Sequence, residues 1–214
     1  MRALTASRKR DGAAERGGAA GAVRGGGAVV AAVLGLTLLT GCGGGGGGTG
    51  GAEIPDGWGT LDAGSVSAGY PEDEGYVPQP AAERAEANAA VALKEEDGLR
   101  TGMVSVQLDF ATGVDDAREA AAAAGAGIGL GTTRTDTRDV RLAGEGSARE
   151  ARRIDYEFTS SGKDRTPVKG TRMSGVVVAG VDSGGVPFAI RIDAVKGSLS
   201  PSDLDAFVGS ITVG

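Results

Sequence analysis

The amino-acid sequence predicts an α+β domain with a mostly antiparallel sheet of about six to seven strands and helices packed on it. Segments of alternating apolar and polar residues follow one another with short turns between them. Only two segments, residues 115–128 and 200–211, have helical periodicity, and strands without intervening helices pair antiparallel. Glycine sets the N-terminal third apart, since 21 of the 40 glycines lie within the first 69 of 214 residues.

The first half of the domain alternates between strands and turns. Residues 64–70 predict a strand that Pro71 ends, because proline has no amide proton for the ladder. Residues 81–97 leave two interpretations open, a helix that begins at residue 81 or a strand over residues 89–94. The strand is favoured, because a second strand over residues 103–110 follows the turn at Asp97-Gly98 and completes a hairpin.

Residues 115–128 are predicted to be helical, with an apolar face that repeats every three or four residues. Asp115 and Asp116 suit the positive end of the helix dipole, and a run of alternating glycines from Gly125 to Gly131 ends the segment. The residues of the apolar face are Val114, Ala117, Ala121, Ala124 and Ile128.

Three longer strands are then predicted over residues 135–142, 149–159 and 171–181, and a tight turn at 182–185 leads into a strand over 186–195. The closing helix has Ser200 as its N-cap and Pro201 at its first position, with Asp203 three residues after the cap. Its apolar stripe, expected to pack on the sheet, consists of Leu204, Phe207, Val208 and Ile211.

One set of polar strand residues allows two interpretations. The candidate partner-docking face consists of Arg153, Asp155, Glu157, Arg191 and Asp193, which alternate with apolar residues in two of the long strands. In the first interpretation this is a solvated or helix-covered face with cross-strand ion pairs. In the second it is a polar surface that docks a partner.

The N-terminus predicts export from the cytoplasm. A basic segment precedes the uncharged residues 28–40, which would span about 20 Å as a helix, short of the roughly 30 Å hydrocarbon core. This length is typical of a secretory signal peptide. Ser7-Arg8-Lys9-Arg10 leaves a twin-arginine route open beside the general secretory one.

Leu39-Thr40-Gly41-Cys42 resembles the lipobox of bacterial lipoprotein precursors, an aliphatic residue, two small residues and a cysteine. The resemblance implies a diacylglyceryl group, labelled by palmitate, on the Cys42 sulfur and cleavage between Gly41 and Cys42. The chain then divides into a signal peptide at 1–41, a glycine-rich tether at 42–56 and one domain at 57–214. The mature protein would be anchored in the cell membrane on its extracytoplasmic face.

Composition excludes several functions. With no histidine and one cysteine, the chain has no Ser-His-Asp or Cys-His pair, no zinc site of the usual kind and no internal disulfide. From Cys42 onward it carries 16 Lys and Arg against 26 Asp and Glu, a net charge of −10 that disfavours nucleic acid. Ser160-Ser161-Gly162-Lys163 matches the S-x-x-K motif but lies in a predicted loop, where the lysine is not placed over the serine. No catalytic residue, metal or cofactor is expected.

A second resemblance concerns residues 55–214. Trp58, Gly69-Tyr70-Pro71, the long hairpins from Arg149 and the closing helix and tail over 204–213 resemble the PsbP-like, LpqN-type lipoproteins of high-GC Gram-positive bacteria. The resemblance implies an α/β/α sandwich and a non-enzymatic binding or assembly role at the cell envelope. The implied partner is an envelope protein or wall component. The alternative is a carrier of an apolar ligand or lipid, which requires a cavity of several hundred Å³.

Lipidation can be tested at Cys42, the single thiol of the chain. Cys42→Ala should abolish incorporation of a palmitate analogue and leave the precursor uncleaved, because the lipid is attached through the sulfur and the peptidase acts on the lipidated form. Metabolic labelling followed by mass measurement of the N-terminus checks both steps. Wild-type protein that takes up no label, or a labelled Cys42→Ala variant, would contradict membrane anchoring.

Overall fold

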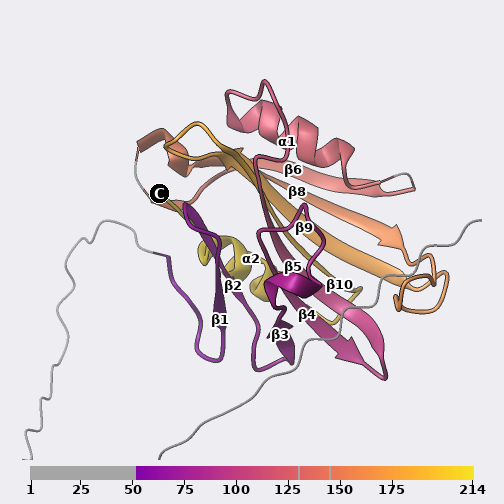
Figure 1. The fold of residues 1–214 in the computed structure, drawn as a ribbon. Helices are drawn as coiled ribbons and strands as arrows, with labels where there is room; N and C mark the ends of the chain where they lie inside the picture. Colours follow the sequence, from indigo (N-terminus) through magenta and orange to yellow (C-terminus); the bar gives the residue numbers. More distant parts are fainter. Residues whose placement is uncertain (1–51, 130, 145) are drawn as a thin grey trace, which may run out of the picture. The chain divides into compact units, whose positions relative to one another are not determined.

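The computed structural model describes residues 52–129, 131–144 and 146–214 (Figure 1). The predicted signal peptide, Cys42 and most of the predicted tether lie outside these residues. The first strands are β1 (Gly59–Asp62), β2 (Val66–Tyr70), β3 (Tyr76–Pro78), β4 (Ala90–Glu96) and β5 (Leu99–Leu108). They are followed by α1 (Ala117–Ala126), β6 (Thr133–Arg141), β7 (Ala143–Gly144), β8 (Glu150–Thr159), β9 (Arg172–Val181), β10 (Pro187–Val195), α2 (Pro201–Gly209) and β11 (Thr212–Val213).

A seven-stranded antiparallel sheet forms the centre of the described fold, in the order β3-β4-β5-β10-β9-β8-β6. A smaller sheet has the order β1-β2-β11-β7, and its β11–β7 pair is parallel. The predicted class, α+β with a mostly antiparallel sheet and two helices, is confirmed. Six of the predicted strands lie in the larger sheet, but the predicted strand over residues 64–70 is β2 and lies in the smaller sheet, which was not predicted.

The two faces of the large sheet are covered differently. On one face α1 packs over β8, β9 and β10 through small side chains, among them Ala120, Ala121 and Ala124. On the other face lie α2, β1 and β2, which enclose the larger core with Phe207, Phe188 and the apolar side of β10. Figure 1 shows α1 on one side of the strands and α2 with β1 and β2 on the other. All buried apolar side chains of the described residues lie between Leu61 and Val213, so a chain that begins at Ala52 contains them all.

The start of α2 follows the predicted capping, whereas α1 covers Ala117–Ala126, shorter than the predicted helix over 115–128, with Asp116 as its N-cap. The Asp116 side chain accepts a hydrogen bond from the Glu119 amide and caps α1. Ser200 and Asp203 form a complete capping box at α2 with Pro201 in the first turn. These caps were predictable because each satisfies backbone donors within one turn of itself.

The ambiguous segment over residues 81–97 contains the favoured strand, β4, preceded by a single 3-10 turn at Ala81–Glu83. Asp97 and Gly98 both have positive φ, 52° and 78°, the conformation of a type I′ hairpin turn. The predicted strand over 103–110 begins earlier, at Leu99, and ends at Leu108, because Asp109 has a φ of 50° and leaves the extended conformation.

Four short strands were not predicted: β1, β3, β7 and β11. They have two to four residues, too few to show a period of alternation. Their positions depend on distant partners, as when Thr212 and Val213 pair with Ser67 and Val66 of β2. Such strands are defined by tertiary contacts and not by local sequence.

Phe207 is completely buried in the larger core, in the middle of the predicted α2 stripe. We expect Phe207→Ala to lower the free energy of unfolding by about 3–5 kcal/mol, because the ring fills space between α2 and the sheet that neighbours cannot close. Leu204→Ala is the matched control, since Leu204 is half-buried in the same helix and should cost less. Chemical denaturation of the chain from Ala52 measures both, and equal small losses would contradict docking of α2 through Phe207.

Candidate functional site

The five residues of the candidate docking face do not share a face of the sheet. Arg153 and Asp155 lie opposite Val178 and Val176, which belong to the core on the α2 side. Arg191 lies opposite Val177, which belongs to the core under α1. Arg153, Asp155 and Glu157 therefore face α2, whereas Arg191 and Asp193 face the α1 side. The single docking face is wrong in this respect, because the register between β8, β9 and β10 decides which side chains are neighbours.

The residues on the α2 side form ion pairs with each other and with neighbouring elements. The Arg153 side chain is 5% exposed; its Nε donates to Asp155 Oδ2 at 2.9 Å and its Nη1 to Asp205 Oδ1 at 2.5 Å. The bond to Asp205 ties β8 to α2. Glu157 receives bonds from Arg172 at 2.6 Å and Lys196 at 2.5 Å, and the two cations lower the pKa of its carboxyl. The ion-pair interpretation is confirmed for these residues, and Arg153 is structural.

On the α1 side, the side chains of Tyr156 and Asp193 meet across β9. The Tyr156 hydroxyl donates a hydrogen bond to Asp193 Oδ1. Gly175 lies between them in register, and a Cβ at that position would come within 2.1 Å of Asp193 Oδ1 and 2.6 Å of the tyrosine oxygen. The absence of a side chain at Gly175 therefore leaves the space in which this hydrogen bond forms.

Asp193 is a buried carboxyl with little compensation for its charge. Asp193 is 8% exposed, and burial raises the pKa of its carboxyl to about 6. Arg191 and the hydrogen bond from Tyr156 lower this pKa, but burial has the larger effect. Arg191 Nη1 lies 3.8 Å from Asp193 Oδ2, and its guanidinium carbon lies 5.7 Å from the centre of the Tyr156 ring. Burial also raises the pKa of Tyr156 well above its ordinary value, so the phenol keeps its proton and remains a donor.

A cleft of about 340 Å³ opens next to Asp193. Its apolar walls are Met103 of β5, Phe158 of β8 and Met173 of β9. Among the described residues that line it, Asp193 is the only acidic one. The remaining lining comes from Arg100, Gly102, Thr159, Ser160, Ser161, Thr166 and Pro167.

The loop between β8 and β9 forms one wall of this Asp193 cleft. The Arg100 amide of β5 donates to the Arg165 carbonyl at 2.6 Å, which attaches the loop to the sheet. Within the loop, the Ser160 hydroxyl donates to the Pro167 carbonyl at 2.5 Å. The S-x-x-K serine thus holds the loop in shape, and Lys163 is exposed.

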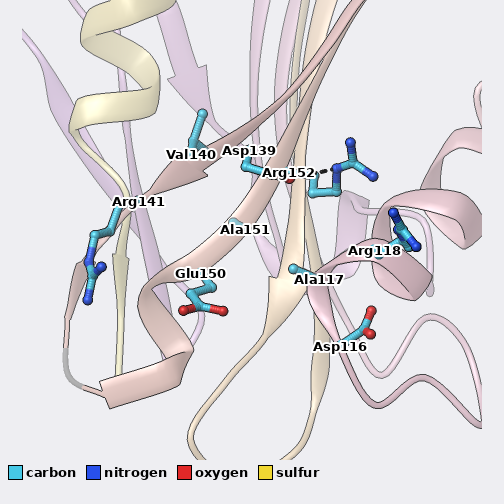
Figure 2. Close-up of a pocket in the computed structure, with 9 residues that line it drawn as sticks. All are labelled: Asp116, Ala117, Arg118, Asp139, Val140, Arg141, Glu150, Ala151 and Arg152. Carbon is cyan, nitrogen blue, oxygen red and sulfur yellow. Dashed lines mark ion pairs between the residues drawn. The ribbon is translucent and has the colours of Figure 1, made fainter.

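A second cleft, of about 620 Å³, lies between the start of α1 and the strands β6 and β8. Figure 2 shows that Arg152 reaches Asp139, and these side chains form an ion pair at 2.9 Å. The described lining residues include three arginines and three acids, Arg118, Arg141, Arg152, Asp116, Asp139 and Glu150. Because these charges balance and Asp116 caps α1, this cleft favours neither sign of ligand charge.

A third cleft, of about 740 Å³, runs between α1 and β5 and shares Met103 with the Asp193 cleft. Its polar lining includes one cation and two acids among uncharged groups: Arg191, Glu86, Asp109, Asn88, Ser105 and Gln107. The two clefts therefore follow one another along the part of the sheet beside α1. Of the three, the Asp193 cleft combines apolar walls with a buried charged group, the usual composition of a small-ligand site.

The described residues contain no group of three or more His, Cys, Asp or Glu side chains placed to hold a metal ion. None of the described helices has the length and apolar character needed to cross a membrane.

Sequence reasoning named Arg191 and Asp193 but missed the rest of this site. Tyr156, Met103 and Met173 fall inside predicted strands, and nothing in the strand pattern marks them as site residues. The one available sign was Gly175, one of two glycines inside β9, since a glycine within a strand often marks a close approach of another group. Which group approaches Gly175 depends on register, which this sign does not give.

The raised pKa of Asp193 predicts a specific pH dependence of stability. In the folded protein the Asp193 carboxyl keeps its proton up to about pH 6, whereas the ordinary pKa of an aspartate is 3.8. Because the folded state holds the proton more tightly, the contribution of this group to the free energy of unfolding is full at low pH and is lost as the pH rises from 4 to 6. Over this pH range the free energy of unfolding of the wild type should fall by about 3 kcal/mol because of Asp193. Asp193→Asn keeps an acceptor for Tyr156 but has no carboxyl to titrate, so its free energy of unfolding should not show this fall. Urea denaturation at intervals between pH 4 and 7 measures the difference between wild type and variant.

Glu157→Gln provides the control for this measurement. Its pKa is lowered by Lys196 and Arg172, so its ionised form contributes stability that is lost as pH falls, the opposite sign to Asp193. A difference between wild type and Asp193→Asn that does not change with pH would contradict the buried, uncompensated carboxylate.

No family model matches this chain, and no curated protein matches it in sequence. Among solved structures it is similar to the Ran-binding protein Mog1p of Saccharomyces cerevisiae, with 12% identity, coverage of 73% of this chain and 95% of that one, and a TM-score of 0.41. It is also similar to a protein of Bacteroides thetaiotaomicron, with 11% identity, 72% coverage of this chain and a TM-score of 0.37. The chain spans about half of that protein, 48% of its length. Neither likeness is close enough to assign a family.

Proposed function

We propose that this chain is a lipid-anchored binding module on the extracytoplasmic face of the cell membrane, with no enzymatic activity. The lipobox Leu39-Thr40-Gly41-Cys42 supports the anchor, as a stretch of contiguous residues with a defined chemistry at the sulfur. The PsbP-like α/β/α sandwich belongs to the same proposal. The presence of α1 on one face of the large sheet and α2 on the other is compatible with that layering.

The observation that carries the binding role is the Asp193 cleft. Binding sites typically combine apolar walls with a few polar groups that fix orientation, and perturbed acids gather in such places. Here Met103, Phe158 and Met173 supply the walls and Asp193 supplies the polar group. A buried charge costs stability unless something pairs with it, so its presence in a cleft favours a role in recognition.

Two kinds of occupant follow from this site. An envelope protein or wall component could insert a side chain or substituent into the cleft, which makes the domain an assembly factor. The apolar walls also favour the second candidate, a carrier of a small apolar ligand. The volume of about 340 Å³ lies at the low end of the range for small-ligand sites.

A photoreactive amino acid placed at Met103 tests this function in the anchored protein within its native envelope. We expect a single cross-linked product from Met103 and none from the control position Val77, an exposed apolar residue of β3 that is 57% exposed. A protein adduct identifies the assembly factor, and an adduct of small mass identifies the carrier. The same products from both positions, or no product from Met103, would contradict a binding role for the cleft.

A further inference from the structure

The Asp193 carboxylate has acceptor capacity that its described neighbours do not use. Two carboxylate oxygens offer about four acceptor positions. Among the described residues, the Tyr156 hydroxyl is the one side-chain donor hydrogen-bonded to this group, and it binds Oδ1. Arg191 Nη1 lies 3.8 Å from Oδ2, beyond hydrogen-bond range. Oδ2 therefore remains without a close donor in a residue that is 8% exposed and lines the cleft.

The residues around Asp193 indicate that a ligand that donates a hydrogen bond to Oδ2 should carry a positive charge. Arg191 lies near the face of the Tyr156 ring rather than in hydrogen-bonding contact with the carboxylate. Arg100, the cation of the described lining, has its Nε 3.6 Å from Glu95 Oε1, an ion-pair contact that, like that of Arg191, is too long for a hydrogen bond. A buried carboxylate is stabilised most by an opposite charge that also donates hydrogen bonds. An anionic ligand would instead meet the one acidic group of the described lining.

The walls and the volume of the cleft indicate that the rest of the ligand is small and apolar. Met103 and Met173 are polarisable and adapt to irregular apolar shapes. The Phe158 ring stacks on Tyr156 with 6.0 Å between the ring centres, and aromatic rings attract a cation held against their faces. At roughly 30 Å³ for each non-hydrogen atom, the volume a water molecule takes, about 340 Å³ holds about ten such atoms.

We propose that the Asp193 cleft binds a small organic cation, a protonated primary or secondary amine on an apolar body of about ten non-hydrogen atoms or fewer. The ammonium group donates to Asp193 Oδ2, and the apolar body lies among Met103, Phe158 and Met173. This inference rests on the proposed binding function and assigns the ligand class of the same site. The cleft is too small for the two acyl chains of a membrane lipid.

The methionines offer a direct readout. The chain has three, Met1, Met103 and Met173, and the latter two line the cleft. In the chain from Ala52, which contains every core residue, ¹³C-methyl labelling of methionine places two probes in the cleft walls. The probe ligands are n-hexylammonium, hexan-1-ol and hexanoate, which share one apolar body and differ in the charge of the head group.

We expect n-hexylammonium to shift both methyl signals saturably and to bind at least about tenfold more tightly than hexan-1-ol, as a charged hydrogen bond contributes this much. Hexanoate should produce no saturable shift. Asp193→Asn should lower the affinity for n-hexylammonium by about tenfold or more and leave that for hexan-1-ol unchanged. Glu157→Gln, which removes a carboxylate from the other face of β8, should change neither.

Equal affinity for the amine and the alcohol, or an unchanged affinity in Asp193→Asn, would overturn the ligand class while leaving a binding cleft in place. If none of the three probes shifts the methyl signals, the amine proposal fails, and cross-linking at Met103 decides separately whether the cleft meets another partner. If Asp193→Asn does not fold, the ratio between n-hexylammonium and hexan-1-ol on the unaltered chain still decides, and a ratio well below about tenfold contradicts the proposal.

Discussion

The antiparallel register of β8, β9 and β10 is the constraint on which the site depends. It places Tyr156, Gly175 and Asp193 in one row across three strands, with the glycine in the middle. Only in this row can the phenol reach the carboxylate, because any side chain at the central position would occupy the space between them. A shift of one residue would turn every side chain of a strand to the opposite face and separate the pair.

The two faces of the large sheet differ in how they are covered: one is buried in the larger core, and the other carries the clefts beside α1. On the α2 side, β10 supplies Phe188, Ile190 and Ile192 to the larger core, and Arg153 links β8 to the helix. On the α1 side, the covering helix is short. Its ten residues extend about 15 Å, whereas the ten residues of β8 or β9 extend about 33 Å. The helix covers the rows of Ile154 and Val177, and the clefts lie beside it along the same strands.

The electrostatics of the cleft follow from the same arrangement. Asp193 belongs to a strand that is buried on both faces along most of its length, so its carboxylate is removed from water. Tyr156 supplies one hydrogen bond, but a phenol carries no charge to balance the carboxylate. Arg191, two residues away on the same strand, faces the same side without close contact. The result is a negative group held in an apolar cleft, where an incoming cation would interact most strongly.

The sequence by itself determined the local features. Alternation identified β5, β8, β9 and β10, the Ser200 cap marked the start of α2, and the acidic pair Asp115 and Asp116 indicated the start of α1, because each of these signals acts within a few residues. The lipobox is equally local, and anchoring through Cys42 stays a prediction from four contiguous residues. Only the tertiary structure separated Arg153 from Arg191, paired β11 with β7 and joined Tyr156 to Asp193. These relations depend on register between segments distant in the chain, and the period of a strand is the same for every register.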